Sequence, residues 1–259
     1  EVAHRMQDRG EDVDVTLFER LYKQRGQALE LSQDDEAAVA NYVEMRAQAV
    51  RRQSKTLELS ALVIQSHLHG HYTGVFNPLK SRELAQQALV LARELGDRAA
   101  EAHALWGLQI AELYSAGDTK QVVAYGQQAL ALAREMELKE LIGLVLNNLA
   151  WPFGAQKKLE QARKEFREAQ SIWWELGNLQ KLAEASRFLL IIHSMAGDHR
   201  SMLIDAPKLS ELGAAIGSRL DEVEALAWLA LAHTRQGHFG QALGYIDQYG
   251  AYAESLGHP

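Results

Sequence analysis

The 259-residue chain contains no cysteine and only four prolines. Without cysteine it can form neither a disulfide nor a thiolate site for a metal or for nucleophilic catalysis, and this fits a reducing compartment such as the cytoplasm. So few prolines leave little room for extended linkers, and 47% hydrophobic residues are typical of a folded chain. We therefore expect a regularly folded cytoplasmic protein.

The sequence also lacks an excess of basic residues and any long hydrophobic run. Lys and Arg number 27 against 34 Asp and Glu, a net charge of −7, so no global positive field favours nucleic acid. No apolar run approaches the roughly 20 residues of a membrane span, and no signal-like segment opens the chain. We expect neither nucleic acid nor membrane as a partner. Because the sequence starts with Glu1 rather than methionine, we also expect a piece of a longer protein.

What the sequence does contain is internal repetition. Glycine follows a large aliphatic residue at Gly177, Gly217 and Gly257, which are 40 residues apart. A second series has the same spacing and consists of Gly117, Lys157, Gly197 and Gly237. Self-similarity at a fixed period of this size is the signature of a solenoid.

Between these marks, apolar residues recur at helical spacing. The segments 82–95, 141–150 and 222–232 each carry an i, i+3/i+4, i+7 stripe, and we find no period-two alternation typical of a strand. The pattern predicts an all-α protein of about six helix-turn-helix repeats of about 40 residues, hence about a dozen helices. The expected repeats are 16–56, 57–97, 98–138, 139–178, 179–218 and 219–259, and residues 1–15 are an N-terminal segment or the end of a preceding repeat.

The repeats resemble a known family. A large residue, a Leu-Ala pair and an aromatic residue follow one another at Leu146, Leu149-Ala150 and Phe153, and Ala162 then precedes Phe166 by four residues. This pattern, which recurs from Tyr22 and from Leu226, is similar to the tetratricopeptide repeat. The segment ALVLARELGD (88–97) is similar to the long repeats in the sensor regions of bacterial signalling ATPases and transcriptional activators, the maltose-regulon activator among them. The resemblance implies a right-handed α-α superhelix whose concave groove is lined by the first helix of each repeat, and it implies no catalysis.

Three alternating histidines, His67, His69 and His71, are the residues most suggestive of a metal site. On a helix His67 and His71 lie one turn apart while His69 points roughly opposite, so three ligands would require an unwound helix end. In register, His67 falls in the small or aliphatic column of Ile110 and Leu190, which favours packing. We therefore expect no metal, cofactor or catalytic residue, since a phosphate loop and a nucleophile elbow are also missing. A metal-dependent enzyme at these histidines is the least favoured alternative.

The register also selects candidate groove residues. Asn147, Trp151 and Arg187 follow the large and small columns by one position and are expected along one inner wall. Amide, indole and guanidinium together suit a ligand with a carboxylate or peptide backbone and an apolar face. The alternative is that Trp151 only packs against its neighbours. The complete set of candidates is Asn147, Trp151, Arg187, Tyr114, His71, Tyr72, Ser194 and Arg235.

These features predict a non-catalytic module of a larger bacterial regulatory or signalling protein. It would bind a protein segment, a peptide or a small effector in its groove, and an adjoining domain would respond to the binding. One ring of Trp173-Trp174 is expected to be buried and the other exposed, as a possible intramolecular contact for a flanking domain. The alternative is a purely structural scaffold that uses its convex face or its ends and leaves the groove empty.

Overall fold

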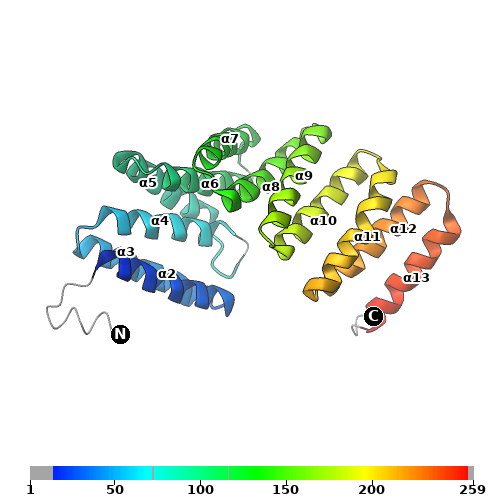
Figure 1. Ribbon diagram of the computed structural model, residues 1–259, viewed down its shortest axis with the longest axis horizontal. Helices are drawn as coiled ribbons and strands as arrows, with labels where there is room; N and C mark the ends of the chain where they lie inside the picture. Colours follow the sequence, from blue (N-terminus) through cyan, green and yellow to red (C-terminus); the bar gives the residue numbers. More distant parts are fainter. Residues whose placement is uncertain (1–13, 72, 116, 256–259) are drawn as a thin grey trace. The chain divides into compact units, whose positions relative to one another are not determined.

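The computed structural model describes residues 14–71, 73–115 and 117–255. These residues form twelve α-helices of 16 to 18 residues and no strand, which confirms the predicted all-α solenoid of repeats (Figure 1). None of the helices in these ranges combines the length and hydrophobicity needed to cross a bilayer. The helices are α2 (Val15–Leu31), α3 (Asp35–Arg51), α4 (Lys55–Gly70), α5 (Pro78–Leu95), α6 (Arg98–Tyr114), α7 (Thr119–Glu135), α8 (Lys139–Ala155), α9 (Leu159–Glu175), α10 (Leu179–Met195), α11 (His199–Ile216), α12 (Arg219–Arg235) and α13 (Phe239–Ser255).

The helices belong to two compact units, residues 1–138 and 139–259. In each unit a helix packs against the next one in the chain, so that the even-numbered and odd-numbered helices alternate. We call the even-numbered helices first helices and the odd-numbered ones second helices. First helices also contact one another directly, as α4 contacts α6 and α10 contacts α12. The expected repeat boundaries stay a prediction.

Left-handed residues connect the helices. Gly177, Gly197 and Gly217 have φ angles of 67°, 67° and 70°, a conformation that glycine adopts without a steric penalty. Glu137 and Lys157 occupy the equivalent positions with φ angles of 54° and 59°. The turn geometry is therefore maintained even where the glycine predicted from the period is replaced.

The core of the second unit depends on close helix approach. Trp173 of α9 is fully buried, whereas its neighbour Trp174 is 70% exposed, so one ring of the pair is buried and the other exposed, as predicted. The motif residues Ala162 and Phe166 are buried on the same helix. Gly143 of α8 has no side chain to separate the two helices, so the α8 backbone reaches the Trp173 ring.

Candidate functional site

In residues 139–259 the first helices are α8, α10 and α12, and we call the side that they form the first-helix face. This face contains three residues predicted as ligand contacts. Asn147 lies in the middle of α8 and is only 4% exposed. Neither its amide nitrogen nor its amide oxygen has a hydrogen-bond partner among the residues that the structure describes. A buried polar group left without a partner costs about 1–3 kcal/mol, so this amide is an exception that calls for an explanation.

Trp151 lies one helical turn after Asn147 and is half-buried. Its ring meets the ring of Phe188 edge-on, with 4.8 Å between centroids, and that of Phe166 at 6.5 Å. Trp151 therefore packs against α9 and α10, as the structural alternative expects, and keeps part of its indole accessible. Both interpretations of this tryptophan stay open.

Pro152 follows Trp151 and lies inside α8, which continues to Ala155. Proline has no backbone N–H, so the carbonyl of Asn148 receives no helical hydrogen bond from the residue four positions later. The segment from Asn147 to Pro152 thus combines a buried side-chain amide without a partner in the described part of the chain, a backbone carbonyl without its helical donor and a partly accessible indole.

Arg187 of α10 faces acidic residues of α12. Its Nε lies 3.4 Å from Oδ1 of the buried Asp221. Burial raises the pKa of Glu224. The positive charge of Arg187 lowers this pKa, whereas the negative charge of Asp221 raises it. The guanidinium expected to receive a ligand carboxylate is thus already paired within the protein.

The remaining predicted contacts are spread over the helices. Ser194 and Arg235 lie at the carboxyl ends of α10 and α12. Tyr114 ends α6, where its ring meets that of Phe76 edge-on at 6.4 Å. Tyr72 lies outside the described residues. These assignments, with His71, stay predictions.

In the first unit, α2, α4 and α6 line a cavity of about 360 Å³ on the first-helix side. His67 and His103 belong to its wall, together with Lys23. His67 Nε2 lies 3.1 Å from the carbonyl oxygen of His103, and its ring meets the indole of Trp106 edge-on at 4.4 Å. Burial lowers the pKa of His67 to about 3, and the nearby His103 lowers it too. His67 is therefore a neutral residue packed between α4 and α6.

The other two histidines of the sequence motif also contact backbone carbonyls. His69 Nδ1 lies 2.8 Å from the carbonyl oxygen of Val75, and His71 Nδ1 lies 2.7 Å from that of His67. A ring nitrogen this close to a carbonyl oxygen must carry the proton and donate it. Within the described ranges no three His, Asp or Glu side chains converge as ligands for a metal. The contact of His67 with Trp106 is thus one of helix packing, and His69 and His71 contact backbone carbonyls near the end of α4.

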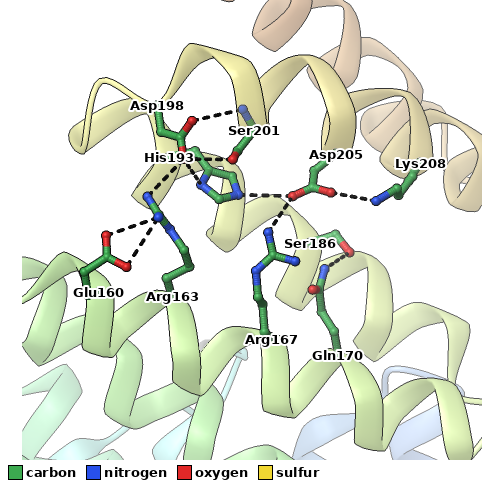
Figure 2. A network of polar contacts seen from close by, with 10 residues as sticks. All are labelled: Glu160, Arg163, Arg167, Gln170, Ser186, His193, Asp198, Ser201, Asp205 and Lys208. Carbon is green, nitrogen blue, oxygen red and sulfur yellow. Dashed lines mark hydrogen bonds and ion pairs between the residues drawn. The ribbon is translucent and has the colours of Figure 1, made fainter.

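The sequence analysis missed a polar network on the second-helix side of the second unit (Figure 2). Asp205 of α11 is buried and accepts hydrogen bonds from His193 at 3.1 Å, from Lys208 at 2.8 Å and from Arg167 at 3.4 Å. Burial alone would raise the pKa of Asp205, but these bonds and the two permanent cations outweigh it and hold the pKa at about 2. The network connects α9, α10 and α11.

A groove of about 670 Å³ lies beside this network between α9 and α11, and Trp174 lines it together with Leu182 and Leu212. A groove of about 840 Å³ occupies the corresponding place between α3 and α5 in the first unit. Arg163 and Arg167, one turn apart on α9, were the signal in the sequence that could have indicated the polar network.

No protein-family model and no curated protein match this chain. Among solved structures, it is similar to a signal transduction ATPase with numerous domains from Pyrococcus horikoshii that carries a tetratricopeptide repeat sensor. The identity is 15% and the TM-score 0.71, over 94% of this chain. The chain has the tetratricopeptide-repeat fold. It spans 38% of the length of that ATPase.

Two further solved structures are similar to this chain in fold. BtubC (BKLC) from P. vanneervenii is 18% identical with a TM-score of 0.67, over 87% of this chain and 94% of its own. A Rap protein complexed with competence and sporulation factor is 14% identical with a TM-score of 0.64, over 98% and 80%. At these identities the likeness concerns the fold alone.

Proposed function

We propose that this tetratricopeptide-repeat chain is a non-catalytic module that binds an extended peptide or protein segment on the first-helix face of residues 139–259. The observation that carries the proposal is the buried amide of Asn147, whose donor and acceptor have no partner in the described part of the chain. A peptide backbone presents N–H and C=O groups, which match the amide oxygen and nitrogen of asparagine.

Binding would recover the free energy that the bare amide costs. Each hydrogen bond restored in a buried position is worth about 1–3 kcal/mol, because the alternative is a desolvated group without a partner. The accessible part of the Trp151 indole adds an apolar surface for one side chain of the ligand. One similar solved structure is a Rap protein in complex with competence and sporulation factor, so a related fold holds a bound factor.

The finer part of the proposal concerns regulation. The module would serve as a sensor in a larger bacterial protein of the kind that resembles signalling ATPases and the maltose-regulon activator. A flanking domain in the cytoplasm would respond when the ligand changes the relative stability of two arrangements of the array. The exposed Trp174 would then be a contact for that domain.

A peptide selection tests the proposal. A random 12-residue peptide library is selected against the whole chain, and the affinities of the selected peptides are measured by fluorescence anisotropy. We expect Asn147→Ala and Trp151→Ala each to weaken binding about 10- to 100-fold, that is about 1.4–2.7 kcal/mol. Trp174→Ala is the matched control, because it removes an indole from the second-helix side.

The same experiment distinguishes the proposed peptide-binding function from the alternative, a structural scaffold. A scaffold that uses the convex side has a specific observation in its favour, the groove of about 670 Å³ lined by Trp174. If the selected peptides lose affinity in Trp174→Ala and keep it in both other variants, the first-helix assignment is wrong and the scaffold interpretation is right.

A further inference from the structure

The first-helix face changes in character from α8 to α12. On α8 it carries the amide of Asn147 and the indole of Trp151, whereas on α12 it carries acidic residues. The ring of Trp151 lies 4.8 Å from that of Phe188 on α10. The adjacent Arg187 pairs with Asp221 of α12, so α10 connects the two ends of the face. A peptide that crosses the three helices would therefore meet both ends.

Glu224 of α12 has a negative charge without a direct partner. It follows Asp221 by three residues, on a neighbouring part of the helix surface. It is half-buried, yet it forms no hydrogen bond and no ion pair with the residues that the structure describes. Burial raises the pKa of Glu224, and the nearby charge of Arg187, which lowers it, does not cancel the rise. The carboxylate is thus only partly compensated, and a further cation beside it would be stabilising.

The neighbouring charges are already paired. Arg187 Nε lies 3.4 Å from Oδ1 of Asp221, which is only 3% exposed. On α10, Lys181 Nζ lies 2.8 Å from Oε2 of Glu184, the residue 40 positions before Glu224. Asp221 and Glu224 therefore share one guanidinium, which leaves one negative charge in excess between α10 and α12.

Apolar side chains lie next to Glu224 on the same side of α12. Ala227, three residues later, is exposed, and Leu231, seven residues later, is half-buried. Trp228 lies one turn after Glu224 and keeps part of its indole accessible. Lysine and arginine lay their methylene groups on apolar surface while the charged group reaches a carboxylate, and an indole also attracts a cation. The surface around Glu224 thus suits a basic side chain.

We infer that the peptide bound by the first-helix face carries a lysine or arginine whose charged group contacts Glu224, which makes Glu224 a determinant of specificity. The inference rests on the proposed peptide binding at Asn147 and Trp151, and it adds the charge of the ligand. Two spacings between packed helices, about 8–10 Å each, separate α8 from α12. An extended peptide advances about 3.3 Å per residue, so the basic residue should lie roughly five or six positions from the residue that contacts Trp151.

The peptides selected from the 12-residue library test this inference. We expect a basic residue at a fixed position, and its replacement by methionine should weaken binding to the wild type about 10-fold. Glu224→Gln should weaken binding of the basic peptide about 10-fold and change that of the methionine analogue less than about 2-fold. Glu222→Gln is the matched control, because it removes the same charge from α12 on roughly the opposite side of the helix. Circular dichroism and thermal melting confirm that each variant is folded.

A charge reversal gives the decisive measurement. Glu224→Lys should prefer an analogue in which glutamate replaces the basic residue, a result that a purely structural role of Glu224 would not produce. Peptides that depend on Asn147 and Trp151 but carry no basic residue, or that bind Glu224→Gln as tightly as the wild type, would overturn the inference and leave the proposed function intact. A library that yields no peptide, or only peptides unaffected by Asn147→Ala and Trp151→Ala, would overturn both.

Discussion

A Cβ added to Gly143 of α8 would lie 2.6 Å from Cζ2 of Trp173 in α9. The indole is fully buried, so it has no space into which it could move. The glycine is therefore needed for the two helices to approach each other, and the tryptophan fills the space that the missing side chain leaves.

Gly143→Ala should destabilise the chain by about 2 kcal/mol, because the extra methyl group overpacks the contact with Trp173. Urea unfolding at neutral pH measures the effect. Gly244→Ala is the control, since a Cβ there meets nothing within 4 Å and alanine gains up to about 1 kcal/mol of helix propensity. Equal stability of the two variants would show that α8 can shift away from the indole.

Asp205→Asn should remove a pH-dependent part of the stability. The pKa of Asp205 is lowered to about 2 in the folded chain, so its stabilisation is complete above pH ~4 and is lost as the pH falls toward ~2. We expect the wild type to lose about 1–2 kcal/mol more than Asp205→Asn over that window, after allowance for solvent screening. Denaturant titrations at about pH 7, 4 and 2 measure the difference. Parallel pH profiles for the two proteins would contradict the depressed pKa.

His67→Leu should reduce the acid sensitivity of the fold. The pKa of His67 is lowered from 6.5 to about 3, because burial disfavours the charged ring. The unfolded chain takes up a proton below pH ~6.5 and the folded chain does not, so stability is lost as the pH falls toward ~3. Between pH ~6.5 and ~4.5 the wild type should lose about 2 kcal/mol more than His67→Leu. Urea unfolding of both proteins at these two pH values measures the two losses of stability. If the wild type and His67→Leu lose the same amount, His67 takes up a proton in the folded chain as readily as in the unfolded one.

Asn147→Leu should stabilise the unbound chain while it weakens peptide binding. Leucine removes a buried amide that has no partner in the described residues, which is worth about 1–2 kcal/mol. Thermal melting without ligand and anisotropy with a selected peptide measure the two effects. A variant that loses stability would indicate that the amide has a structural role instead.

The helices and their turns could be predicted because they depend on local spacing. Apolar periodicity fixes the buried face of each helix, and the repeat register by itself assigns His67 to the packing residues, where it meets Trp106. The sequence also predicts that one ring of the pair Trp173-Trp174 is buried and the other exposed, and the structure shows that Trp173 is the buried one.

The polar pairs could not be predicted in the same way. Arg187 pairs with Asp221 and Asp205 with His193, and in each case the partner comes from a different helix. Such pairs depend on the separation and rotation of neighbouring helices, which a one-dimensional pattern does not contain. For the same reason the sequence placed Arg187 in the groove but did not show that its charge is already paired.

The left-handed residues at Glu137, Lys157, Gly177, Gly197 and Gly217 are spaced by 20 residues, half the period of the sequence pattern. Each of these connections, between a first and a second helix or the reverse, therefore passes through one left-handed residue at a constant spacing. A 40-residue block cut at any two equivalent left-handed residues could be duplicated or deleted without rebuilding a single turn. Growth of such an array by gene duplication would then be limited by the fit of side chains between neighbouring blocks and not by the connection of the backbone.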